Sequence, residues 1–157
     1  MPELEDMRLF AEQLVARRNR AAMLLASDAA GQQAYAEKLA SHLQAQHIDV
    51  LAVFQKDEKL LARLSYFSDD DLLEWIAQHR DQKLLVISGI EFLLAVWLSQ
   101  GEPSQVKRTL CQKIEFWQQS PAFLLVIQED PVFAGYLPER HRGSRIVLPT
   151  SHTLAIE

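Results

Sequence analysis

The stretch that decides the fold lies near the amino terminus and reads Met23-Leu24-Leu25-Ala26-Ser27-Asp28-Ala29-Ala30-Gly31-Gln32-Gln33-Ala34-Tyr35. It opens with an apolar run of strand length and bends at Gly31. After the bend, Tyr35, Leu39 and Leu43 recur at helical spacing on one face. The stretch therefore predicts a buried strand, a turn and a helix, the opening unit of an α/β fold.

The turn has the layout of a phosphate-binding loop but lacks the residues that hold a phosphate. A working loop reads Gly-x-x-x-x-Gly-Lys-Ser/Thr, with the lysine on the terminal phosphates and the hydroxyl on Mg²⁺. Here Ala26 replaces the first glycine and Gly31 keeps the second, while Gln32 and Gln33 replace the lysine and the hydroxyl residue. We take as phosphate-loop-like the residues Ser27, Asp28, Gly31, Gln32 and Gln33.

Two later segments fit the same architecture. The strand-length run Lys83–Ile87 would end, in a nucleotide-hydrolysing core, in an aspartate for Mg²⁺. Ser88 occupies this Walker-B-like position, and Glu91 after it either reaches the loop or favours a helix start. Gln128 holds a sensor-like position after the fourth predicted strand, unless it is polar only because the chain returns to solvent there. Since ligands bind at the carboxyl ends of parallel strands, the predicted functional edge comprises residues 27–33, 88–91 and 128–130.

Short apolar runs alternate with helical patterns along the whole chain. The predicted strands are about Ala21–Ala26, Ile48–Phe54, Lys83–Ile87, Ala122–Ile127 and Arg145–Leu148. Predicted helices include one before the first strand, one capped by Ser68 and one opened by Ser104. This alternation predicts right-handed crossovers and a three-layer, five-stranded parallel sheet, in a single domain of residues 1–157.

Composition limits the function classes. The net charge of −5 argues against a surface built as a whole to bind nucleic acid. A lone cysteine, Cys111, gives no disulfide framework, and the histidines show no metal-ligand spacing, so no metal site is expected. The acidic amino terminus and the lack of a long apolar run predict a cytoplasmic protein.

The order of loop, strand-end serine, polar fourth strand and basic turn resembles the AAA+ branch of P-loop ATPases, without a helical lid. The resemblance implies that an arginine finger, which stabilises charge on the transferred phosphoryl group, lies within Leu137–Pro149. Arg142 is the first candidate and Arg140 the second. The alternative is a solvated basic turn.

More narrowly, the chain is similar to the small P-loop proteins of bacteriophage-exclusion (BREX) systems, called BrxF. The likeness rests on small size, on Ser88-Gly89-Ile90-Glu91 after the third strand, and on the basic turn between Tyr136 and Arg145. Members of that family keep the lysine and the aspartate, whereas this chain has Gln32 and Ser88.

These two losses remove a charged phosphate contact and a support of Mg²⁺, so we expect no hydrolysis by this chain alone and no cofactor; ATP with Mg²⁺ is what the loop would otherwise take. The leading hypothesis is a catalytically inactive ATPase-like accessory or regulatory subunit. It would act through protein contacts with a larger bacterial complex or an active ATPase, in phage defence or DNA processing, and meet nucleic acid only indirectly. One alternative is a weak ATP-binding or hydrolysing subunit that borrows a neighbour's residues. Another is a free-standing inhibitor with an ATPase-like fold. The apolar runs at residues 72–76 and 92–98 either face the partner or fill the core.

Overall fold

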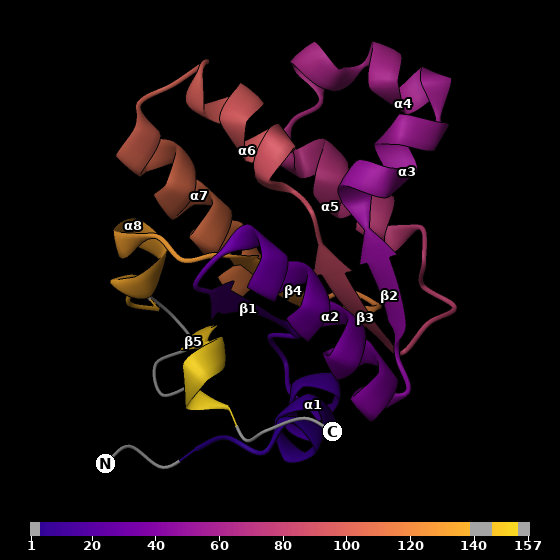
Figure 1. Cartoon of the computed structure of the whole chain (residues 1–157), viewed down its shortest axis with the longest axis vertical. Coiled ribbons are helices and arrows are strands. Elements are labelled where there is room, and N and C mark those ends of the chain that lie inside the picture. The colour runs from indigo at the N-terminus through magenta and orange to yellow at the C-terminus, as the bar shows by residue number, and fades with distance from the viewer. Residues whose placement is uncertain (1–3, 139–145, 154–157) are drawn as a thin grey trace.

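The computed structural model describes residues 4–138 and 146–153 as an α/β fold around one sheet. The sheet has five parallel strands in the order β2-β3-β4-β1-β5, which confirms the predicted five-stranded parallel sheet and is consistent with a P-loop-like core (Figure 1). The strands are β1 (Ala21–Ala26), β2 (Gln46–Asp49), β3 (Leu84–Ser88), β4 (Ala122–Gln128) and β5 (Val147–Pro149).

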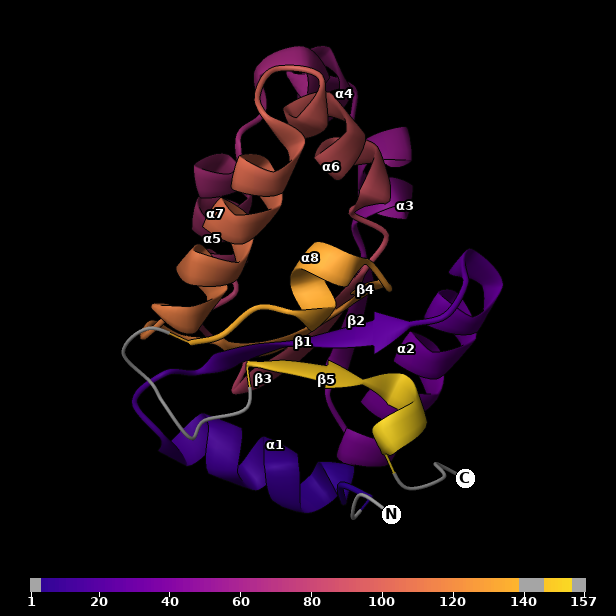
Figure 2. The same ribbon diagram turned by 90° about the vertical axis from the view of Figure 1, so that its left-hand side faces the viewer.

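Helices cover both faces of the sheet (Figure 2). On one side lie α1 (Met7–Ala16) and α2 (Ala29–Leu43). On the other side lie α3 (Val50–Lys56), α4 (Glu58–Ala62), α5 (Asp69–Ala77), α6 (Glu91–Leu98), α7 (Pro103–Glu115) and α8 (Pro131–Ala134). Two short 3₁₀ helices, Leu64–Tyr66 and Thr150–His152, complete the described chain. No helix among the described residues 4–138 and 146–153 is long and apolar enough to cross a membrane.

The core is split between the two faces by the alternation of strand side chains. In β1, Met23 and Leu25 pack into the cluster under α5, α6 and α7. Ala22 and Leu24 pack into the cluster under α1 and α2. Because every second residue points to the opposite face, a strand covered on both sides must be apolar throughout. This requirement explains why β1 and β4 match their predicted starts and lengths within one residue.

The second predicted strand, Ile48–Phe54, is largely wrong. The strand β2 ends at Asp49 and the chain then turns into helix α3. Asp49 caps that helix, since its Oδ1 accepts the backbone N–H of Ala52 at 3.4 Å. Val50 and Phe54, four residues apart, are buried together as one helical face requires. The correction brings the carboxyl end of β2, and with it Asp49, to the predicted functional edge.

Helix starts follow the side chains that can accept the first free N–H groups. Ser68 caps α5 as predicted: its hydroxyl oxygen accepts the Asp71 N–H, and the Asp71 carboxylate accepts the Ser68 N–H, which completes a capping box. The predicted opening of α7 at Ser104 is wrong, because Glu102 caps the helix and Pro103 is its first residue.

The apolar runs at residues 72–76 and 92–98 are largely absorbed by the core. Leu72, Ile76, Leu93 and Trp97 are buried within the cluster on the α5 side. Ala95 is exposed. Partly buried side chains pack around that cluster, among them Leu73, Trp75, Phe92, Val96 and Leu98.

Candidate functional site

The turn between β1 and α2 is shorter than a phosphate-binding loop. Strand β1 ends at Ala26 and α2 begins at Ala29, so only Ser27 and Asp28 connect them. Gly31 therefore lies in the first turn of the helix, which begins earlier than the sequence predicted. The carboxylate of Asp28 accepts the backbone N–H of Gly31 at 2.5 Å. A helix start whose free N–H groups would attract an anion is thus capped by a carboxylate of the chain itself.

Gln32 reaches across the edge to the segment after β3. Its side chain is only 4% exposed, and its amide nitrogen donates a hydrogen bond to Oε2 of Glu91. Its amide oxygen accepts the backbone N–H of Gly89 at 3.3 Å. The same Glu91 oxygen accepts the backbone N–H of Gln128 at 2.9 Å. One carboxylate therefore links the three segments that the sequence predicted to form the edge.

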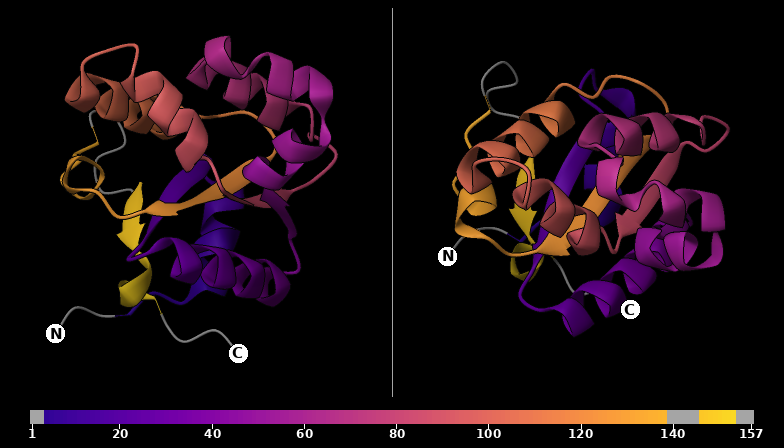
Figure 3. Two further views of the ribbon diagram at one scale, coloured as in Figure 1. Left: turned by 45° about the horizontal axis from the view of Figure 1, so that its top comes forward. Right: turned by 90° about the horizontal axis from the view of Figure 1, so that it is seen from above.

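Gln33 belongs to a second set of contacts at the end of β2. The view from above shows α2 passing over the carboxyl ends of the strands (Figure 3, right). Ser88 is fully buried, and its hydroxyl donates to the Gln33 amide oxygen at 3.1 Å. His47 Nε2 lies 2.8 Å from the same hydroxyl oxygen. The Gln33 amide nitrogen donates to Asp49 Oδ2 at 3.4 Å. The two glutamines in the lysine and hydroxyl positions thus hold neighbouring strand ends together.

Burial lowers the pKa of His47, although the negative charges of Asp49 and Glu37 act in the opposite direction. The lowered pKa favours a neutral imidazole, which suits its contact with an uncharged hydroxyl.

The turn after β3 requires a glycine. Gly89 has a φ of 75°, a conformation that L side chains rarely adopt. A Cβ at this position would also collide with Asp49 Oδ1 and lie 3.3 Å from the backbone nitrogen of Leu51. The close approach lets the Gly89 N–H reach Gln32 while the Asp49 carboxylate caps α3.

The edge offers acceptors and neutral amides rather than cations. Asp28, Asp49 and Glu91 bring three carboxylates to it. Within residues 4–138 and 146–153, no lysine or arginine forms a hydrogen bond or ion pair with Gln32, Gln33 or Ser88. The buried Ser88 hydroxyl is already hydrogen-bonded, and the described side chains bonded to Gln32, Gln33 and Ser88 include no cation that would hold a phosphate.

The structure brings together Asp28, Gly31, Gln32, Gln33, Ser88 and Glu91 from the predicted set. Ser27 is exposed in the turn. Gln128 takes part through its backbone N–H, whereas its predicted sensor role concerned the side chain. The candidate finger residues Arg140 and Arg142 lie outside the described residues.

Sequence reasoning missed Asp49 because the second strand was predicted to run on to Phe54, and it missed His47 because that strand was predicted to begin only at Ile48. The missed signal was an aspartate followed by Val50 and Phe54 at helical spacing, which is typical of a capped helix.

No protein-family model matches the chain, and the search of curated proteins found no match either. The resemblance to AAA+ ATPases and to BrxF therefore stays a prediction.

Proposed function

We propose that this chain is a catalytically silent P-loop NTPase-like domain of the AAA+ type that works through protein contacts, as an accessory or regulatory subunit of a bacterial multi-subunit assembly. The observation that carries the proposal is the pair of contacts made by Gln32. Its side chain stands where a lysine would hold phosphates, but it is uncharged, buried and hydrogen-bonded to Glu91 and Gly89. A phosphate at this point would have to break those bonds without gaining a charge-assisted one.

The carboxylates of the edge support the same conclusion. A helix amino terminus attracts anions through its free N–H groups and its dipole. At α2 the Asp28 carboxylate already binds the Gly31 N–H. A nucleotide phosphate would meet this exposed charge and that of the partly buried Glu91, whose repulsion is the less screened by water. Asp28 and Glu91 therefore disfavour both ATP binding and hydrolysis.

The remaining assignment rests on the resemblance to BrxF and the AAA+ branch. On that basis we propose a role in phage defence or DNA processing, beside a larger complex or an active ATPase. The net charge of −5 supports indirect rather than direct contact with nucleic acid.

Thermal unfolding with and without millimolar ATP or ADP and Mg²⁺ tests the silent state. We expect no shift in Tm beyond that caused by Mg²⁺ alone. A ligand present at a hundred times its Kd would add about 2.7 kcal/mol of stability. A clear nucleotide-dependent rise in Tm would instead favour a weak ATP-binding subunit. The variant Asp28→Ser/Gln32→Lys is the matched comparison, because it removes one carboxylate and restores the lysine.

A further inference from the structure

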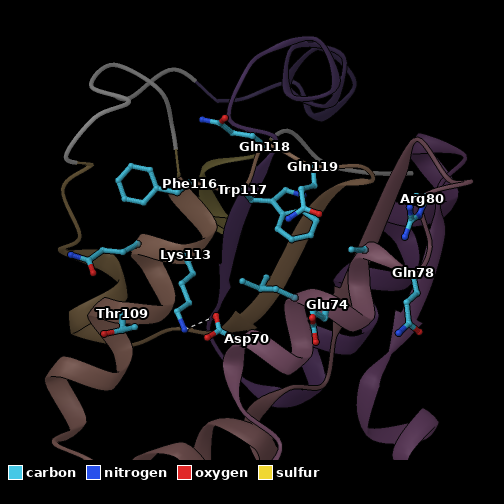
Figure 4. Close-up of a pocket in the computed structure, with 13 residues that line it drawn as sticks. Asp70, Glu74, Gln78, Arg80, Thr109, Lys113, Phe116, Trp117, Gln118 and Gln119 are labelled. Carbon is cyan, nitrogen blue, oxygen red and sulfur yellow. Dashed lines mark ion pairs between the residues drawn. The ribbon is translucent and has the colours of Figure 1, made fainter.

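A groove of about 1030 Å³ lies between α5 and α7 (Figure 4). The two helices are joined at one end, where Lys113 Nζ lies 2.7 Å from Asp69 Oδ1 and 2.8 Å from Asp70 Oδ1. Beyond this junction the groove continues to Gln118 and Gln119, which follow α7. It is separate from the carboxyl edge described above, since no residue of that edge lines it.

The residues that line the groove recur at helical spacing along both α5 and α7, as in two helices that pack against a third. The α5 wall consists of Asp70, Leu73, Glu74, Ala77 and Gln78, which are spaced i, i+3, i+4, i+7 and i+8. The α7 wall consists of Thr109, Gln112, Lys113 and Phe116, spaced i, i+3, i+4 and i+7. Residues at these spacings form one face of a helix, and two such faces across a hollow match the ridges of a helix between them.

The groove also offers an apolar contact surface. Leu73 and Ala77 on α5 are partly buried, and Phe116 is 37% exposed. Trp117 is held in place, because its indole N–H donates to the Pro121 carbonyl at 2.9 Å and its ring packs edge-on against Phe123. Trp117 is itself only 4% exposed, so it forms the floor of the groove, and the exposed aromatic contact is Phe116.

Charge selects the kind of helix. Asp70 and Glu74 give the α5 wall an acidic row, and only Asp70 has a cation, Lys113, within ion-pair distance. Glu74 is exposed and forms no ion pair with any residue in the described ranges. Arg80, at the other end, forms none either, so it disfavours a cation there. The complementary ligand is amphipathic and carries its positive charge beside Glu74.

We propose that the α5–α7 groove is the docking site for a basic amphipathic helix of a partner protein. The helix places apolar residues at i, i+3 or i+4, and i+7 on Leu73, Ala77 and Phe116, and a lysine or arginine opposite Glu74. The proposal rests on the function proposed above and adds the surface and the chemistry of the partner.

Two synthetic helical peptides of about 18 residues, or five turns, test this assignment. Both carry leucine at the apolar spacing, and they differ only in having lysine or glutamate on the flanking positions. We expect the lysine peptide to shift the backbone amide resonances of Leu73, Ala77 and Gln119 in the full chain. Ala77→Arg, which fills the groove, should weaken the binding about tenfold or more. Ala95→Arg, the same change at an exposed position of α6, should leave it unchanged. Glu74→Lys should weaken binding about two- to fivefold, as expected for one exposed charge pair.

Several results would overturn the groove assignment. They are the absence of groove shifts at millimolar peptide, equal binding of the glutamate peptide, or equal binding by Ala77→Arg and Ala95→Arg. Groove shifts that grow with the concentration of the chain alone would assign the surface to a second copy instead. A nucleotide-dependent rise in Tm would contradict the silent state but not the groove, so the two proposals fail separately.

Discussion

The carboxyl edge of the sheet and the α5–α7 groove differ in whether their polar side chains are buried and bonded within the chain or exposed. At the edge, Gln32 and Ser88 are almost wholly buried, and each bonds to other residues of the chain. In the groove, Glu74 and Arg80 are exposed and form no ion pair with the described residues. Side chains that satisfy one another hold a fold together, whereas exposed charges beside apolar surface are available to a partner. Changes at the edge should therefore alter stability, and changes in the groove should alter binding.

The largest loss of stability is expected from Gly89→Ala at the edge. The φ of 75° disfavours any L side chain, and the new Cβ would collide with Asp49. We expect a loss of about 2–4 kcal/mol in the free energy of unfolding, measured by urea denaturation. Gly101→Ala is the control, since a Cβ there meets only the Val106 side chain, at 3.1 Å. Equal losses in the two variants would mean that the Gly89 turn adapts to a side chain.

The second-largest loss of stability is expected from Glu91→Ala. The change leaves the buried amide nitrogen of Gln32 and the backbone N–H of Gln128 without their shared acceptor. Leaving such donors unsatisfied costs about 1–3 kcal/mol, which the same denaturation measurement resolves. Glu129→Ala, at an exposed neighbouring position, should change stability by less than about 0.5 kcal/mol. If Glu91→Ala leaves the free energy of unfolding unchanged, solvent replaces the carboxylate and the edge is open.

Lys113→Met tests the junction at which the groove ends. Burial lowers the pKa of Lys113, but hydrogen bonds and attraction from Asp69 and Asp70 outweigh it, so the net shift is upward. The raised pKa means that the folded chain stabilises the charged lysine. We expect the variant to lose about 1 kcal/mol of stability at low salt, and less at 1 M salt because screening weakens the pairs. A loss that does not change with salt would point to packing by the lysine stem instead.

The pH dependence of stability should carry a smaller contribution from His47. Its pKa in the folded chain lies below the ordinary value of 6.5, so between these two values the unfolded chain binds more protons. Stability should fall as the pH drops from 6.5 toward the folded pKa, and only shallowly, because the imidazole is partly exposed. His47→Gln should flatten this part of a urea-midpoint curve. An unchanged curve would mean that protonated His47 keeps the contact with Ser88.

Sequence patterns predicted the scaffold better than the site. Strands β1 and β4 were found because a strand covered on both faces must be apolar throughout. The second strand was misjudged because Val50 to Phe54 is apolar enough for a strand, and the capping residue Asp49 before it was overlooked. The residue types of Gln32, Ser88 and Glu91 marked the lost phosphate chemistry. Their mutual hydrogen bonds join residues far apart in the chain, and no local pattern encodes such contacts.

The smallest effect on stability is expected from the groove variants Glu74→Lys and Ala77→Arg. Glu74 is exposed and has no cation to lose, so its change should alter the free energy of unfolding by less than about 0.5 kcal/mol. Ala77 is only partly buried and lines an open groove, so a longer side chain can occupy the groove without displacing the core. Both variants should unfold at the same urea concentration as the parent chain while binding the basic peptide more weakly. If either variant destabilises the chain as much as Glu91→Ala does, the groove belongs to the packed structure and the contrast between the two regions disappears.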